Sequence, residues 1–70
     1  MTMDIDLLLD NRPHRVPDGT TLAMLVAQLG HQPRDVGTAL NGRFVPRNER
    51  GESLLRAGDA VLLFQPIVGG

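Results

Sequence analysis

The sequence of 70 residues contains no cysteine, no tryptophan and no tyrosine. The absence of cysteine excludes disulfides, cysteine-based metal sites and any mechanism in which this chain supplies a thiol nucleophile. Lysine is absent too, since all seven basic residues are arginines, and the N-terminus is therefore the only amine. These absences leave little side-chain chemistry with which the chain could act as an enzyme by itself.

A basic excess is also missing, since the formal net charge is -1. Proteins that bind nucleic acid or anionic membranes normally carry such an excess, so neither is an expected partner. The arginines are spread along the sequence rather than clustered. No apolar run reaches the length of a membrane span, and the N-terminus lacks the pattern of a signal peptide. The expected location is the cytoplasm.

The composition is typical of a small folded domain. Hydrophobic residues make up 41% of the chain, which is ordinary for a globular protein and too high for a disordered one. A chain of this length forms one domain (1–70) with a small core.

The first segment alternates apolar and polar residues from Met3 to Leu9, which predicts a strand with one buried and one solvated face. Leu8 is the one apolar residue on the solvated side. Turn residues at 10–13 and a short strand at 13–16 complete an expected antiparallel hairpin.

An apolar stripe with helical spacing follows and predicts the helix of the fold, about two and a half turns long. The stripe consists of Leu22, Leu25, Val26 and Leu29. Thr21 offers a hydroxyl to cap the start of this helix, and Gly30 stands where a left-handed residue would end it. The position three residues after the cap is Met24 rather than a glutamate, so no capping box is expected.

The rest of the sequence predicts shorter elements. Gly37 interrupts the first of them. In chain order they are a weak strand at 36–40, the turn Asn41-Gly42, a strand at 43–45, a polar loop at 47–53, a helical turn at 54–55 that places one leucine in the core, and a strand at 60–64.

This order of elements predicts an α+β fold of the β-grasp type, as in ubiquitin. Its mixed sheet of four to five strands packs on one helix, because the apolar stripe of that helix must cover one face of the sheet. The last strand is expected beside the first and parallel to it, followed by a flexible, exposed tail at 65–70. The alternative is an SH3-like open barrel, which the helix disfavours.

Alternation in the last strand directs Val61 and Leu63 toward the helix and Leu62 and Phe64 away from it. Solvated positions of a one-sided sheet are normally polar, but these two are large and apolar. Together with Leu8 they predict a partner-docking patch, because contiguous exposed apolar surface usually marks an interface. The alternative is that a loop covers them or that they are scattered surface residues.

No set of catalytic or metal-ligating side chains stands out, and no metal site is predicted. His14 and His31 lack an acid at triad or ligand spacing, and the aspartates of the first strand are the solvated side of its alternation. The candidate for chemistry is the end of the sequence, where Gly69 and Gly70 follow Ile67-Val68. Residues without side chains pass easily through a narrow channel, although a frayed terminus is the plainer interpretation.

The length of the chain and three of its regions make it resemble the ThiS family of sulfur carrier proteins, which serve thiamine biosynthesis. The most specific features are the Asn-Gly turn followed by Val-Pro-Arg and the terminal Gly-Gly. The matching regions are 17–22 with 25–30 around the helix, 39–47, and 58–65 running on to Gly69-Gly70.

The resemblance implies that Gly70 is the sulfur-carrying residue. A ThiF-like adenylating enzyme would activate its carboxylate with ATP and magnesium, so the chain itself is expected to bind no cofactor. Sulfur from a cysteine desulfurase persulfide then replaces AMP and leaves a thiocarboxylate. A ThiG-like thiazole synthase takes up this sulfur, and Ile67, Val68 and Gly69 thread the tail into the enzymes.

Two positions depart from the family pattern. Gly37 lies within an expected strand, and Arg50-Gly51 stand where the family often has an aromatic residue. The last seven residues also resemble the end of the small subunit of molybdopterin synthase. The alternative functions are therefore a sulfur carrier for that or another thio-metabolite pathway, a ubiquitin-like protein modifier, and a binding module with an inert tail.

Overall fold

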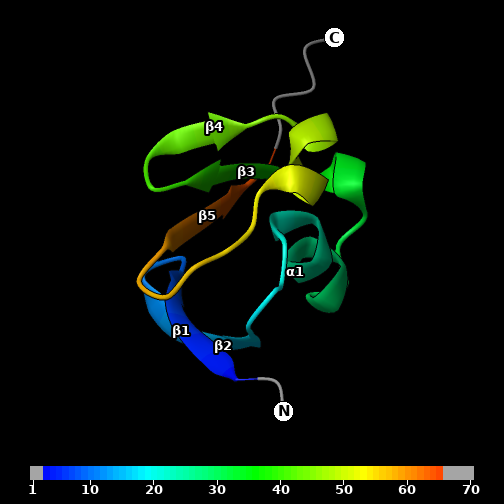
Figure 1. The fold of residues 1–70 in the computed structure, drawn as a ribbon. Helices are drawn as coiled ribbons and strands as arrows, with labels where there is room; N and C mark the ends of the chain where they lie inside the picture. The colour runs from blue at the N-terminus through cyan, green and yellow to red at the C-terminus, as the bar shows by residue number, and fades with distance from the viewer. Residues whose placement is uncertain (1–2, 66–70) are drawn as a thin grey trace, which may run out of the picture.

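Five strands pair in one mixed sheet in the computed structural model, which describes residues 3–65 (Figure 1). The order across the sheet is β2-β1-β5-β3-β4. The pair β1 and β5 is parallel and the two hairpins are antiparallel, as the sequence predicts, and β3 pairs antiparallel with β5. The elements are β1 (Asp4–Leu9), β2 (Arg12–Pro17), α1 (Leu22–Gln28), η1 (Pro33–Asp35), β3 (Gly37–Leu40), β4 (Arg43–Val45), η2 (Arg47–Glu52) and β5 (Ala60–Phe64).

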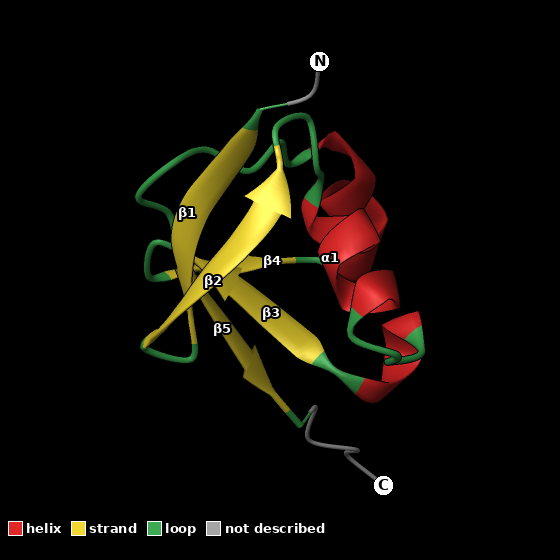
Figure 2. Cartoon of the chain, turned by 90° about the horizontal axis from the view of Figure 1, so that it is seen from below, coloured by secondary structure: helices red, strands yellow, loops and turns green. Residues whose placement is uncertain are grey.

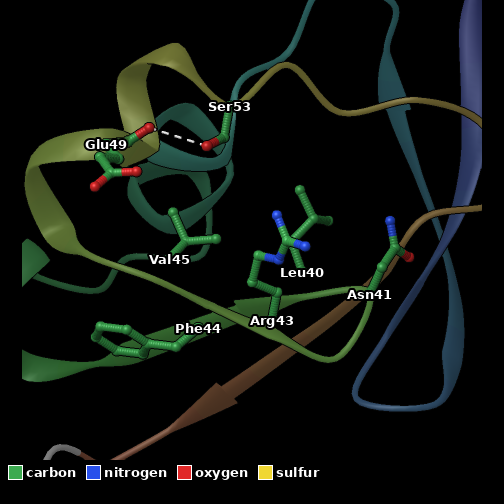
Figure 3. A pocket seen from close by; sticks show the side chains of 7 residues that line it. All are labelled: Leu40, Asn41, Arg43, Phe44, Val45, Glu49 and Ser53. Carbon is green, nitrogen blue, oxygen red and sulfur yellow. Dashed lines mark hydrogen bonds between the residues drawn. The ribbon is translucent and has the colours of Figure 1, made fainter.

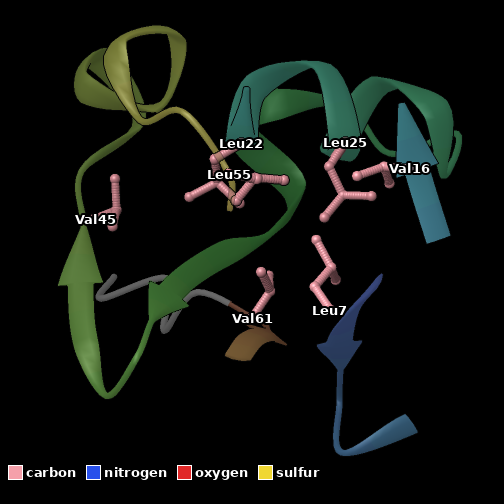
Figure 4. Packing of buried hydrophobic residues seen from close by; sticks show 7 residues of the cluster. All are labelled: Leu7, Val16, Leu22, Leu25, Val45, Leu55 and Val61. Carbon is pink, nitrogen blue, oxygen red and sulfur yellow. The ribbon is translucent and has the colours of Figure 1, made fainter. Parts of the chain in front are cut away.

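The helices lie on one side of the sheet, as Figure 2 shows, and the core fills the space between the two layers (Figure 4). Helix α1 contributes two core leucines, and four of the five strands contribute one residue each. The buried cluster consists of Leu7, Val16, Leu22, Leu25, Val45, Leu55 and Val61. No helix within residues 3–65 is long and apolar enough to cross a membrane.

Both hairpins turn through two residues with positive φ, which suits the right-handed twist of the strands they join. Asp10 and Asn11 have φ of 51° and 66°, and Asn41 and Gly42 have φ of 53° and 83°. The first turn is therefore shorter than the predicted 10–13, and its second strand begins at Arg12 rather than at Pro13. Asp and Asn permit this tight turn because they tolerate the left-handed region better than other residues with side chains.

Helix α1 is one residue shorter than its apolar stripe, because Leu29 is its C-cap. Gly30 follows with φ of 82°, and its amide donates to the carbonyl of Ala27 while the amide of His31 donates to that of Val26. This pattern is a Schellman motif, in agreement with the predicted role of the glycine.

The start of α1 corrects one prediction. The amide of Met24 donates to Thr21 Oγ1 at 3.2 Å, and the amide of Thr21 approaches Met24 Sδ at 3.5 Å. Methionine thus occupies the reciprocal position of a capping box, although its sulfur is a weak acceptor compared with a carboxylate. The box forms because an unbranched thioether reaches back over the same distance as a glutamate.

The segment between β4 and β5 also differs from the prediction. Residues 47–52 form the 3₁₀ helix η2 rather than an irregular loop, and they pack against α1. Leu54 and Leu55 are extended rather than helical, because Leu54 bridges to Thr21 and the Leu55 amide donates to Thr20. Leu55 enters the core and Leu54 stays exposed, so the prediction that one leucine is buried is confirmed.

Candidate partner-docking face

The outward residues of β5 lie on the face of the sheet that the helices leave open. Leu62 and Phe64 are 41% and 43% exposed, whereas Val61 is fully buried. Leu8 is 41% exposed and pairs with Ala60 on the same face. The predicted orientation of Leu8, Leu62 and Phe64 is therefore confirmed, while their role in docking stays a prediction. Of the predicted tail at 65–70, Ile67, Val68, Gly69 and Gly70 lie outside the described residues.

Phe64 lies across the neighbouring strand at Gly37, with which it pairs. A Cβ atom added to Gly37 would stand only 2.1 Å from the nearest atom of the Phe64 ring. The glycine that interrupts the apolar pattern of the strand is thus the residue that makes room for an aromatic ring on the open face. This departure from the family pattern has a direct structural reason.

A second aromatic residue, Phe44, joins the face from β4 and is 60% exposed. Its ring centroid lies 6.3 Å from that of Phe64, with the two rings tilted by 41°. Phe44 and Phe64, called here the aromatic pair, extend the apolar surface beyond the residues that the sequence predicts. The signal for Phe44 was present in the alternation of β4, since Val45 enters the core on the opposite side.

Three arginines, one from η1 and two from η2, meet beside the aromatic pair. Together they line an open cavity of about 580 Å³, whose wall consists of Arg34, Gly37, Phe44, Arg47, Arg50, Phe64 and Gln65. The sequence suggested no such cluster, because η1 and η2 bring these arginines together only through the fold. The cavity adjoins Gln65, the first residue of the predicted tail.

Arg50 is the buried member of this cluster and is only 3% exposed. Its guanidinium donates to the carbonyl of Pro33 at 2.8 Å, to that of Val36, and to Thr38 Oγ1 at 2.9 Å. Burial, reinforced by the charge of Arg47, lowers the pKa of Arg50 from its ordinary value. The guanidinium is held by three neutral oxygens, and it fixes η2 against β3.

A second cavity, of about 440 Å³, lies on the other side of β4 (Figure 3). Phe44 and Val45 point to opposite sides of the strand there, and Ser53 Oγ donates to the carbonyl of Glu49 at 2.9 Å. The wall consists of Leu40, Asn41, Arg43, Phe44, Val45, Glu49 and Ser53.

The Asn-Gly turn and the Gly-Asp turn of the family pattern meet in space. Asn41 Nδ2 donates to Asp59 Oδ1 at 3.0 Å, and Asn41 Oδ1 accepts from the amide of Ala60 at 2.8 Å. The other oxygen of Asp59 accepts from the amide of Arg56 at 2.8 Å. These contacts fasten the start of β5 to the β3–β4 hairpin.

Asp10 fastens the other end of β5. Its amide donates to the carbonyl of Val61 at 2.9 Å, and its Oδ1 accepts from the amide of Leu63 at 3.0 Å. The carboxylate thus continues the pairing of β5 past the last residue of β1. Within residues 3–65, no three His, Cys, Asp or Glu side chains gather where they could hold a metal ion.

Comparison with known proteins gives one consistent family. The model of the ThiS family matches residues 6–70. The sulfur carrier protein ThiS of Escherichia coli (strain K12) is 30% identical over 66 residues, which cover 94% of this chain and 100% of that protein.

Solved structures agree with this match. The crystal structure of the thiamine biosynthesis protein ThiS from Geobacter metallireducens superposes with a TM-score of 0.82 at 25% identity, covering 94% of this chain and 100% of the other. The fold is shared by SAMP1 from Haloferax volcanii, with a TM-score of 0.54 and 20% identity over 97% of this chain and 100% of the other. It is shared too by a Caldiarchaeum subterraneum ubiquitin, with a TM-score of 0.53 and 22% identity over 100% of each chain. These likenesses identify the architecture as the predicted β-grasp.

Proposed function

This chain belongs to the ThiS family of sulfur carrier proteins, and from that membership we propose that Gly70 carries sulfur as a C-terminal thiocarboxylate. The observation that carries the proposal is the family match, which runs to the glycines at the end of the sequence. The open apolar face at the end of β5 supports it, because β5 leads directly into the tail. A partner that grips this face stands next to the residues on which it must act.

The proposed chemistry takes place at one carbon atom. The Gly70 carboxylate attacks the α-phosphorus of ATP, pyrophosphate leaves, and an acyl adenylate results. The terminal sulfur of a persulfide then attacks the acyl carbon, and AMP leaves with the bonding electron pair, which gives an acyl disulfide. A thiol of a partner protein attacks the outer sulfur of that acyl disulfide, forms a new disulfide with it, and releases the thiocarboxylate of Gly70. Activation is needed because a carboxylate is a poor electrophile until a good leaving group is attached. The chain contributes no acid, base or thiol, which agrees with its composition.

Three partner proteins follow from this chemistry. A ThiF-like adenylating enzyme binds the ATP and magnesium, a cysteine desulfurase supplies persulfide sulfur, and a ThiG-like thiazole synthase consumes the thiocarboxylate. The adenylating enzyme and the thiazole synthase each need Gly70 in a buried active site, and a tail without side chains at 69–70 reaches such a site at small steric cost. The docking patch of Leu8, Leu62 and Phe64 is the proposed contact with the adenylating enzyme.

The test is the intact mass of the chain after incubation with the adenylating enzyme, ATP, magnesium and a persulfide donor. We expect the mass gain of one oxygen-to-sulfur exchange, and its complete loss when Gly70 is deleted. Gly51→Ala is the matched control, because a Cβ at Gly51 meets nothing within 4 Å and the residue lies far from the tail in the sequence. A wild-type chain that gains no sulfur would overturn the proposal.

The same incubation separates the alternatives. Covalent adducts between Gly70 and lysines of other proteins would identify a protein modifier instead. A thiocarboxylate that molybdopterin synthase consumes and thiazole synthase does not would assign the carrier to the other pathway. Undiminished pathway output after removal of Gly69-Gly70 would identify a binding module with an inert tail.

A further inference from the structure

The wall of the cavity beside the aromatic pair holds three arginines and no carboxylate, whereas Asp35, Glu49 and Glu52 of η1 and η2 lie outside this wall. Arg34 and Arg47 are exposed there, and Arg50 is buried behind them. The only salt bridge within residues 3–65 joins Arg15 to Asp6 on the β1–β2 half of the sheet. Among the described residues, the three arginines of the cavity therefore have no carboxylate within 4 Å.

Arg50 makes this positive field a fixed feature of the fold. Its guanidinium is bonded only to neutral oxygens, so its charge is not cancelled by a counter-ion among residues 3–65. Buried charges are normally paired, and an unpaired one raises the potential in its surroundings. Burial, and after it the like charge of Arg47, lowers the pKa of Arg50 from its ordinary value. A nearby anion would relieve this repulsion.

The surface of the cavity combines this charge with an apolar wall. Phe44 and Phe64 supply the wall, and Arg34 and Arg47 flank it. The complement of such a surface is a protein segment with an apolar side chain that packs against the rings and carboxylates that meet the two arginines.

We propose that the cavity between the aromatic pair, Arg34 and Arg47 is the socket for an acidic segment of the adenylating enzyme. The proposal rests on the proposed function and adds the chemistry of the partner's contact. The socket adjoins Gln65, so the segment that fills it fixes the point from which the tail departs. The β1–β2 half of the face carries Asp4 and the paired charges of Asp6 and Arg15, so it offers the same segment no net positive charge. The charges therefore orient the enzyme as well as attract it.

The test measures by calorimetry how tightly two charge-reversed chains bind the adenylating enzyme. One chain carries two substitutions and the other carries one. Arg34→Glu combined with Arg47→Glu should weaken binding by about tenfold or more and flatten its dependence on salt. Arg56→Glu is the matched control, because Arg56 is exposed but lies outside the cavity wall. Circular dichroism should show both chains folded, since the three substituted side chains are exposed.

The socket would be overturned if the double variant bound as tightly as the wild type. It would also be overturned if Arg56→Glu lost as much binding affinity as the double variant. The wild-type chain is assayed in parallel for thiocarboxylate by intact mass. If the wild-type chain forms the thiocarboxylate but binding does not depend on the charges, the socket alone is rejected. If the wild-type chain forms no thiocarboxylate, the proposed function is rejected. The two failures are therefore read from different measurements on the same samples.

Discussion

The open face of the sheet has two halves of opposite character. On the β1–β2 half, Asp6 and Arg15 pair across the strands at 2.9 Å, and both side chains face water. On the half formed by β5, β3 and β4, the outward positions hold Leu62, Phe64 and Phe44. Neither half is covered by a helix, so solvent exposure alone does not explain the difference. The polar half is satisfied by water, whereas the apolar half is suited to a protein partner.

The largest expected effect comes from a charge on the apolar half. Phe64→Asp or Leu62→Asp should weaken binding to the adenylating enzyme by about 30-fold or more, because buried interface anchors contribute roughly 2 kcal/mol. Calorimetric titration measures the loss, and circular dichroism reports the fold. Asp6→Leu, an apolar residue on the polar half, is the control and should leave binding unchanged. Unfolding of both β5 variants would contradict the outward orientation of these residues.

Substitution of Arg50, the buried arginine behind the socket, should affect the stability of the fold rather than docking. Arg50→Met should lower the free energy of unfolding by about 2 kcal/mol, because the buried carbonyl of Val36 and the partly buried carbonyl of Pro33 lose their donor. Urea unfolding followed by circular dichroism measures the change. Arg47→Met, an exposed neighbour, should change stability little, and equal effects of the two substitutions would contradict the structural role of Arg50.

A smaller effect is expected where the aromatic ring crosses its neighbouring strand. Gly37→Ala should displace the Phe64 ring and weaken binding several-fold while the chain stays folded, because the added methyl group occupies the position of the ring. The ring proton shifts of Phe64 in NMR spectra should change as well. In the background of Phe64→Ala the same glycine substitution should have no further effect on binding. Additive losses would show that Gly37 acts independently of the ring.

The smallest effect belongs to the polar half. The charge of Asp6 raises the pKa of Arg15 through a hydrogen bond and direct attraction, yet the pair is exposed. Exposed ion pairs contribute little, so Asp6→Asn should leave both the melting temperature and enzyme binding within error of wild type. A clear loss of binding would erase the distinction between the two halves.

The sequence predicted those parts of the fold that depend on local pattern. Alternation identified the strands and the outward direction of Leu62 and Phe64, and Gly30 marked the end of α1 correctly. These features depend on neighbours two to four residues away, where periodicity and turn chemistry act directly.

The missed features depend on contacts between distant segments. Arg50 is predicted as part of a polar loop, because its partners Val36, just before β3, and Thr38, in β3, become its neighbours only in the folded chain. In the sequence, Gly37 only interrupts the pattern of its strand. Its role in making room for the Phe64 ring becomes visible in the structure. The arginine socket was missed for the same reason, since spacing along the sequence does not reveal which surface charges converge.

The central claim, that Gly70 carries the sulfur, is tested most directly on one peptide. Cleavage by trypsin after Arg56 releases residues 57–70, a peptide that contains neither methionine nor cysteine and therefore has no sulfur of its own. After reaction with the adenylating enzyme and a persulfide labelled with heavy sulfur, tandem mass spectrometry should find one labelled sulfur in this peptide, confined to the fragment that holds Gly70. A peptide 57–70 without sulfur, or a label on any other residue, would contradict the account.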